Sequence, residues 1–167
     1  MKYTILETAL KEYGTKEVPG DGNNPEVVKY YRGNAVDDSV PWCDQFVDWC
    51  LVQNGLEGTK PMTARSYMDY GMPIALPRLG DIVVFWRGSK DGWQGHVGFY
   101  ISEDENNIFV LGGNQSDQVN IKPYAKSRLL GYRRPQDIVD HVNESSCEQQ
   151  ERTNSLLVKI IKIILKK

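Results

Sequence analysis

One cysteine and one histidine stand where thiol chemistry needs them. Cys43 follows Pro41 by two residues and opens an apolar helical stripe. The first turn of a helix offers unpaired backbone N–H groups and the positive end of the helix dipole, which stabilise an anion. We therefore expect the pKa of the Cys43 thiol to fall below its ordinary value of about 8.5. The same N–H groups are expected to hold the oxyanion of a tetrahedral intermediate.

His96 begins the strand-like run HVGFYIS (96–102), directly after the glycine-flanked loop GSKDGWQG (88–95). Val97, Phe99 and Ile101 alternate on the apolar, core-facing side, which leaves His96 on the other face at one end of the sheet. A buried cysteine or a single histidine is more often structural than catalytic. Together, the two residues are the pair that thiol catalysis requires, with Cys43 as nucleophile and His96 as base.

A third polar group should orient the imidazole, and the loop LGGNQSD (111–117) offers Asn114, Gln115 and Asp117. If the runs 96–102 and 107–112 pair as antiparallel strands, this loop lies near His96. Asn114 is our first choice for the orienting residue. The alternative is that Gly-Gly-Asn only makes a tight turn.

Several other residues are candidates for contacting substrate. Asp44 either stabilises the helix dipole or contacts substrate amines, and Gln115 either assists His96 or binds substrate. The aromatic residues Trp42, Trp86, Trp93 and Tyr100 either line a cleft or belong to the core.

The remaining cysteines do not predict further chemistry. Cys50 lies seven residues after Cys43, about 10 Å along one helix, which is too far for a disulfide; we interpret it as a small buried side chain. Three irregularly spaced cysteines do not form a disulfide framework, and their spacing does not suggest a metal site. We expect no cofactor.

The elements that must position these residues change type along the chain. Helices are expected over 3–13, from Pro25, from Pro41 to the Asn54-Gly55 stop, and over 64–70. Strands are expected at 81–86, 96–102, 107–112, 118–121 and 129–134. Helices followed by an antiparallel sheet predict the α+β class. We predict a catalytic domain at 1–135, followed at 136–167 by a polar linker and a helix.

Charge divides the chain in the same way. Residues 156–167 carry four lysines and no acidic residue, which leaves the first 155 residues at −6 out of a total of −2. Such a body is a poor nucleic-acid binder. The start of the chain shows no secretory signal, so we expect synthesis in the cytoplasm and access to an external substrate after lysis or by dedicated export.

The segment LLVKIIKIILKK (156–167) predicts a cationic amphipathic helix. It is too short and too charged to span a bilayer, which needs about 20 apolar residues. The helix either lies on an anionic membrane surface or packs against its own domain or a second copy of the chain. The sequence does not reveal the oligomeric state.

Four segments, taken in order, resemble the CHAP amidohydrolase/peptidase family and its NlpC-like relatives. They are PWCDQFVDWC (41–50), LGDIVVFWRG (79–88), GHVGFY (95–100) and LGGNQ (111–115). The segments EVPGDGNNPEVVKYY (17–31) and RLLGYRRP (128–135) are similar to a branch found in phage and prophage proteins. The resemblance implies a papain-like α+β fold, with the catalytic helix packed on the antiparallel sheet. It also implies an endolysin-like peptidoglycan hydrolase that cuts a stem-peptide amide or the muramoyl–alanine link.

By that resemblance the nucleophile maps to Cys43, the base to His96 and the polar third residue to Asn114. Two departures stand out. Many CHAP proteins carry an acidic residue two positions before the asparagine, where this chain has Gly112. The small residues that commonly follow the nucleophile are here Asp44 and Gln45.

Two other functions stay open. A catalytically idle wall-binding protein would account for Gly112. A membrane-active toxin would use the segment 156–167 as its effector and the folded domain as a carrier.

Overall fold

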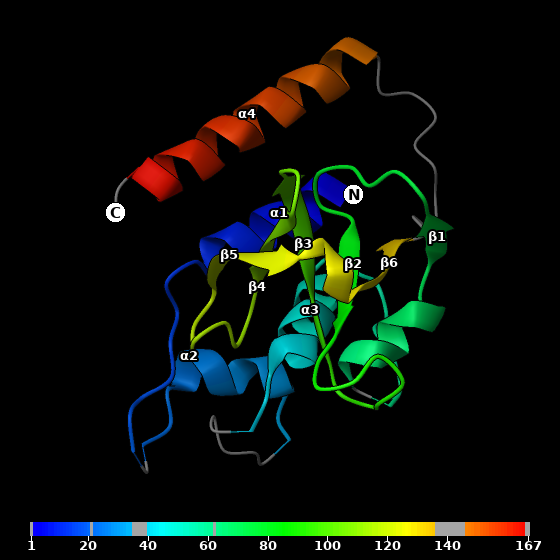
Figure 1. The fold of residues 1–167 in the computed structure, drawn as a ribbon. Helices are drawn as coiled ribbons and strands as arrows, with labels where there is room; N and C mark the ends of the chain where they lie inside the picture. Colours follow the sequence, from blue (N-terminus) through cyan, green and yellow to red (C-terminus); the bar gives the residue numbers. More distant parts are fainter. Residues whose placement is uncertain (1, 21, 35–39, 62, 136–145, 166–167) are drawn as a thin grey trace.

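The computed structural model describes residues 2–20, 22–34, 40–61, 63–135 and 146–165. Helices from the first third of the chain pack against a sheet, and a long C-terminal helix lies across the first helix (Figure 1). The helical elements are α1 (Lys2–Lys11), α2 (Pro25–Val28), η1 (Lys29–Tyr31), α3 (Cys43–Val52), η2 (Ala64–Asp69), η3 (Lys126–Arg128) and α4 (Ser146–Leu165). The strands are β1 (Met72–Ile74), β2 (Ile82–Trp86), β3 (Gly95–Glu103), β4 (Asn107–Gly112), β5 (Asn120–Ala125) and β6 (Leu129–Arg134).

The strands form one antiparallel sheet in the order β1-β6-β2-β3-β4-β5, which confirms the α+β prediction. Four of the five predicted strands are confirmed within a residue or two. The strand expected at 118–121 is displaced, and β5 begins at Asn120. The reason is that Gln118 pairs with Lys16 in an isolated bridge, while Val119 exchanges backbone hydrogen bonds with the 14–15 segment.

Alternation along the strands gives the sheet two apolar faces. Val97, Phe99 and Ile101 lie on the face covered by α1 and α3, as predicted. The opposite face carries a smaller cluster around Phe85, and His96 pairs with Phe85 in the β2–β3 register, so its side chain belongs to this second face. His96 therefore lies on the side of this smaller cluster, and it is itself fully buried there.

The helix that carries the nucleophile starts and stops as its sequence predicts. α3 begins at Cys43 and ends at Val52, and the chain turns at Gly55 with φ +75°. Its inner stripe, which includes Phe46, Val47, Cys50 and Leu51, is fully buried. This stripe fixes α3 against β3, so the first turn of the helix meets the first residues of that strand.

α4 begins at Ser146, ten residues before the predicted amphipathic segment, and packs against α1. Leu156 and Ile160 are buried in the main core, and Lys159 forms an ion pair of 2.8 Å with Glu7. Packing on its own domain, one of the two alternatives, is therefore what the helix does. None of the described helices has both the length and the apolar character that a membrane span requires. The predicted boundary after residue 135 adjoins residues 136–145, which lie outside the described residues.

Candidate active site

Cys43 is the first residue of α3 and is 5% exposed. Its sulfur accepts hydrogen bonds from the backbone N–H groups of Asp44 and of Val97, the residue after His96. A second contact joins α3 to the loop after β4. Gly113 lies so close to the start of α3 that a Cβ atom there would come within 2.7 Å of Phe46. The start of β3 and the loop after β4 are thus both held against the first turn of α3.

The pKa of the Cys43 thiol is raised to about 11, because burial outweighs the hydrogen bonds to the sulfur and the nearby charge of Arg87. Our sequence-based expectation of a lowered pKa was wrong. It weighed the helix terminus alone, whereas a buried thiolate loses its hydration. The resting nucleophile is a thiol, and a base must remove its proton.

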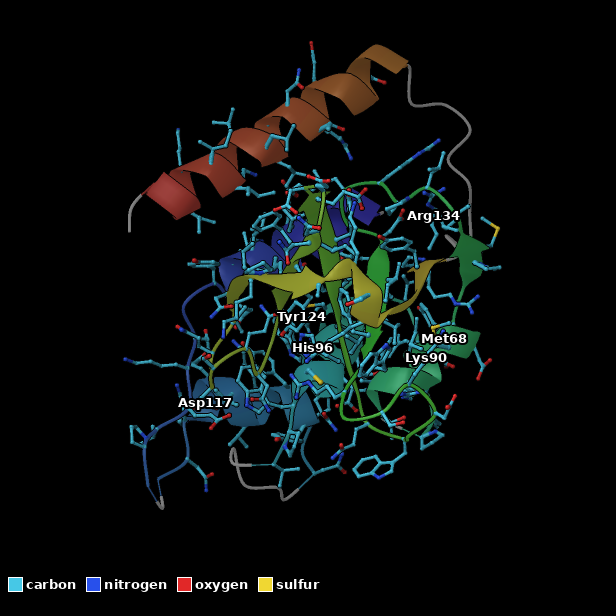
Figure 2. All side chains as sticks on the ribbon, viewed as in Figure 1. Met68, Lys90, His96, Asp117, Tyr124 and Arg134 are labelled. Atoms are coloured by element: carbon cyan, nitrogen blue, oxygen red, sulfur yellow. The ribbon has the colours of Figure 1, made fainter. Side chains whose placement is uncertain are left out.

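His96 is fully buried beside that thiol. Its ring stacks on Tyr124 with the centroids 4.6 Å apart and an interplanar angle of 15° (Figure 2). Burial raises the pKa of Tyr124 to about 12, and the charge that Cys43 can carry adds to that rise. Cys43 and His96 thus share two neighbours, Val97 and Tyr124. Their roles as nucleophile and base stay predictions.

Gln115 orients the imidazole. Its Oε1 lies 3.0 Å from His96 Nε2, while its Nε2 donates to Val110 O (3.2 Å), Asn120 O (2.6 Å) and Asn120 Oδ1 (3.0 Å). Because the amide nitrogen faces three acceptors, the amide oxygen must face His96. His96 Nε2 therefore carries a proton and donates it, which leaves Nδ1 as the basic nitrogen.

Asn114, our first choice for this role, does not contact His96. It adopts a left-handed turn conformation with φ +51°, and the chain then continues through Gln115, whose side chain turns back to the ring. The space for that side chain comes from Gly112. A Cβ atom at position 112 would lie 3.1 Å from Gln115 Oε1 and 3.4 Å from His96 Nε2. Gln115 thus fills the space that a side chain at 112 would fill.

Arg87 contacts the other ring nitrogen, with its NH2 group 3.1 Å from His96 Nδ1. A guanidinium can only donate, so Nδ1 must accept, which agrees with the tautomer that Gln115 imposes. Burial and the charge of Arg87 lower the pKa of His96 to about 3, against the opposing effect of the hydrogen bond that His96 donates to Gln115. The resting pair is therefore a neutral imidazole beside a neutral thiol.

Asp44 caps the start of α3 instead of facing solvent. Its carboxylate accepts hydrogen bonds from the backbone N–H groups of Asp44 and Gln45, yet burial raises its pKa to about 7. Its Oδ2 atom has no hydrogen-bond partner in the described part of the chain. The N–H groups of Asp44 and Gln45 thus act on side chains of the same turn, whereas that of Cys43 acts on neither side chain. The oxyanion role expected for these amides stays a prediction.

The predicted aromatic residues are divided between core and surface. Trp42 is fully buried, donates to Glu17 Oε1 at 2.6 Å and stacks on Tyr30, so it is a core residue and not part of a cleft. Trp86 is partly buried beneath Arg128, and Tyr100 packs edge-on against Tyr132. Trp93 is 79% exposed on the loop between β2 and β3, where it is free to touch a large substrate.

Sequence reasoning missed Arg87, Tyr124 and Asn120. Arg87 had a usable signal, because it directly follows β2 and so lies at the same end of the sheet as His96. Tyr124 and Asn120 gave none, since both reach the site from β5, whose register the sequence did not set correctly.

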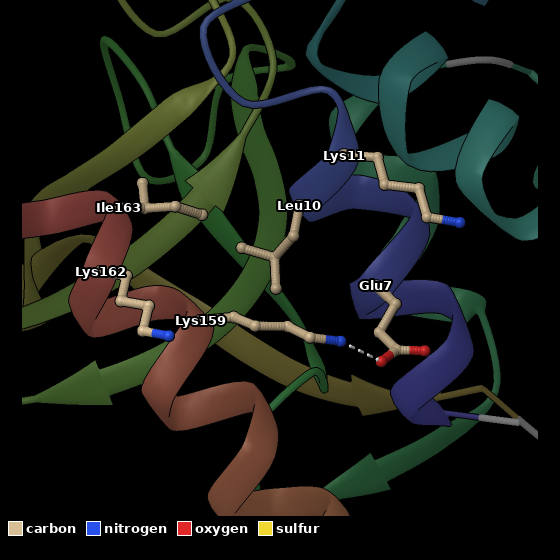
Figure 3. A pocket seen from close by; sticks show the side chains of 6 residues that line it. All are labelled: Glu7, Leu10, Lys11, Lys159, Lys162 and Ile163. Carbon is tan, nitrogen blue, oxygen red and sulfur yellow. Dashed lines mark hydrogen bonds and ion pairs between the residues drawn. The ribbon is translucent and has the colours of Figure 1, made fainter. Parts of the chain in front are cut away.

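Two other features lie outside this site. Cys50 is fully buried in α3, as expected, and no group of metal-binding side chains occurs in the described ranges. A groove of about 580 Å³ separates α1 from α4 and is lined by Glu7, Leu10, Lys11, Lys159, Lys162 and Ile163 (Figure 3). None of the residues around Cys43 lines it.

Residues 35–114 match the family model described as the CHAP domain, which contains both Cys43 and His96. A comparison with curated proteins gave no match.

Solved structures resemble the whole fold at low sequence identity. A protein of the NLP/P60 family from Staphylococcus aureus, described as similar to lipoprotein, superimposes with a TM-score of 0.50 and 20% identity over 81% of this chain. NlpC1 from Trichomonas vaginalis gives 0.51 and 18% over 80%. This chain spans only 42% and 43% of those two proteins. RipD from Mycobacterium tuberculosis, described as a non-catalytic NlpC/p60 domain protein, gives 0.47 and 15%, over 78% of this chain and 93% of its own.

Proposed function

We propose that this chain is a cysteine hydrolase that cleaves an amide bond of peptidoglycan, because residues 35–114 match the CHAP domain model and the fold is similar to that of NlpC/P60 proteins. One observation supports the proposal above the others. The backbone N–H of Val97, the residue after His96, acts on the Cys43 sulfur. Gln115 fixes His96 as the tautomer whose Nδ1 accepts a proton.

The proposed reaction is acyl transfer. His96 Nδ1 takes the thiol proton as the sulfur attacks the amide carbonyl, and the Cys43 N–H stabilises the oxyanion. The imidazolium then gives its proton to the departing amine as the C–N bond breaks. Water, deprotonated by His96, attacks the resulting thioester and releases the acid and the free thiol. Gln115 keeps the ring in place through each proton transfer.

The test is digestion of purified peptidoglycan followed by mass spectrometry of the soluble muropeptides. The bond cut follows from the masses and from the new amino group, which separates the muramoyl–alanine link from stem-peptide amides. Cys43→Ala is expected to release nothing. Cys50→Ala removes a sulfur from the same helix, two turns away, and is expected to digest at the wild-type rate. Release by Cys43→Ala would refute the proposed nucleophile.

One observation favours the idle wall-binding protein as a second candidate. The thiol is nearly sealed and its pKa is about 11. Both candidates then predict slow alkylation by iodoacetamide, so alkylation does not separate them. Binding of wild-type protein to peptidoglycan with no soluble product would favour the idle protein.

We also propose that α4 attaches the enzyme to an anionic membrane, in an endolysin-like role after lysis or dedicated export. The outward side of the helix supports this, since Leu157, Val158 and Ile161 are 39%, 49% and 52% exposed beside Lys162. An apolar stripe flanked by lysine suits a lipid interface. Wild-type protein is expected to sediment with anionic vesicles, and the double variant Leu157→Ser, Ile161→Ser to stay in solution. Equal sedimentation of both would contradict the membrane role, and so would strong binding to neutral vesicles.

A further inference from the structure

Arg87 donates a hydrogen bond to His96 Nδ1, the nitrogen that must accept a proton in the proposed reaction. Arg87 directly follows β2 and its backbone N–H donates to Gln94 O at 3.1 Å, which places the residue at the loop end of the β2–β3 hairpin. From there the NH2 group reaches His96 Nδ1 at 3.1 Å, and the guanidinium also hydrogen-bonds the Tyr124 side chain. The base cannot take a proton from Cys43 while its lone pair is shared with Arg87.

The guanidinium has no carboxylate within ion-pair distance in the described part of the chain. Two other arginines do have such a partner, since Arg32 pairs with Asp48 at 2.7 Å and Arg134 with Asp81 at 2.8 Å. The positive charge of Lys122 also acts on His96. Asp44, the acid that follows Cys43, has a pKa of about 7 and is protonated in a large fraction of molecules near neutrality. The two charges that act on His96, those of Arg87 and Lys122, are therefore both positive and would attract an anion.

A planar guanidinium matches a carboxylate, because two parallel N–H groups can donate to its two oxygens. Its two present acceptors, an imidazole nitrogen and a phenol oxygen, are neutral and give weaker hydrogen bonds. A carboxylate that reaches the hairpin end would draw Arg87 away from His96. It would also neutralise the charge that holds the pKa of His96 down, so the imidazolium formed during the reaction would cost less free energy.

We propose that Arg87 binds a free carboxylate of the substrate beside the scissile amide, and that this binding releases His96 Nδ1 to act as the base. The proposal rests on the proposed hydrolase function and narrows its substrate class to peptide amides flanked by an unmodified carboxylate. Arg87 then discriminates between acidic and amidated forms of the same wall peptide.

The experiment compares two forms of one purified peptidoglycan. One is untreated, and in the other the carboxylates have been converted to amides with ammonia and a carbodiimide. Wild-type enzyme is expected to release muropeptides about 10- to 100-fold more slowly from the amidated wall, the range that a charged hydrogen bond supports. Arg87→Met is expected to digest both forms at one common rate. Lys90→Met, which removes an exposed cation from the same hairpin, should discriminate as the wild type does.

The outcomes separate the two proposals. Wild-type digestion of both forms at equal rates would overturn the role of Arg87 and leave the hydrolase intact. Continued discrimination by Arg87→Met would do the same. If that variant does not fold, Arg87→Lys keeps the charge without the planar fork and is expected to show a smaller ratio than wild type; an unchanged ratio would count against the proposal. Digestion of neither form by wild type would overturn the hydrolase and this inference with it.

Discussion

Gln115 accepts the hydrogen bond from His96 Nε2–H, and a double substitution can move this acceptor from position 115 to position 112. Gln115→Ala removes the acceptor of the His96 Nε2–H and three hydrogen bonds to Val110 and Asn120. Each of these four hydrogen bonds contributes about 1 kcal/mol, so the free energy of unfolding should fall by at most about 4 kcal/mol. Loss of the orienting bond alone corresponds to a fall in kcat of about 10-fold or more.

The second substitution supplies the acceptor from the other side. A Cβ atom at position 112 lies 3.4 Å from His96 Nε2, and Gly112 does not have a positive φ, so Gly112→Asn fits the backbone. In the double variant Gly112→Asn, Gln115→Ala, the new amide oxygen is expected to accept from Nε2–H and to restore most of kcat. The single variant Gly112→Asn crowds Gln115 Oε1 at 3.1 Å and should be less stable than wild type.

Two assays follow the swap, namely muropeptide release and the nitrogen NMR spectrum. The chain has two histidines, so the imidazole region is simple to assign. A slowly exchanging Nε2–H proton of His96 is expected in wild type, absent in Gln115→Ala and present again in the double variant. Full activity in Gln115→Ala would refute the orienting role of Gln115. So would a double variant that regains the proton signal but not kcat.

Four further predictions concern global or local stability. The pKa of Asp44 in the folded state is raised from 3.8 to about 7, so the folded state binds an extra proton between these values and wild-type stability falls as the pH rises through them. Asp44→Asn should therefore be more stable than wild type by up to about 4 kcal/mol above pH 7 and should lose this advantage by pH 4, as measured by urea unfolding. The pKa of His96 in the folded state is lowered from 6.5 to about 3, so wild-type stability falls as the pH falls between these values. His96→Asn should therefore become more stable relative to wild type over that range. Equal pH dependence of the two proteins would contradict a neutral buried ring. Gly113→Ala would place a Cβ atom 2.5 Å from a buried ring and should cost about 1–3 kcal/mol by the same unfolding assay. Leu156→Ala with Ile160→Ala should release α4, seen as faster hydrogen exchange confined to that helix; unchanged exchange would mean that these side chains do not hold it.

The sequence predicted the fold where periodicity is strong. The apolar alternation of Val97, Phe99 and Ile101 and the stripe of α3 placed both elements within a residue or two of their true bounds. β1 escaped prediction because it is a three-residue edge strand that contains Pro73. The residues of β5 were shifted because backbone pairing with the 14–16 segment extends the preceding loop, and local pattern carries no information on such distant contacts.

The sequence named candidate residues for the site but not their electrostatics. Cys43 and His96 are candidates because of their spacing and residue chemistry. The pKa of the thiol does not, because it depends on how much of Cys43 the fold covers. The choice between Asn114 and Gln115 depended on which way one residue turns in a loop, and the positive φ of Asn114 decides it.

The position of Gln115 bears on how active members of such families are recognised. The imidazole needs an oxygen at one point in space, and the backbone of the 112–115 loop lets that oxygen come from more than one residue number. A sequence signature that compares alignment positions one by one would count Gly112 and Asn114 as departures from the catalytic pattern and would class the chain as inactive. A signature written as a distance from Nε2 would class it as intact, so surveys of inactive homologues need coordinates as well as alignments.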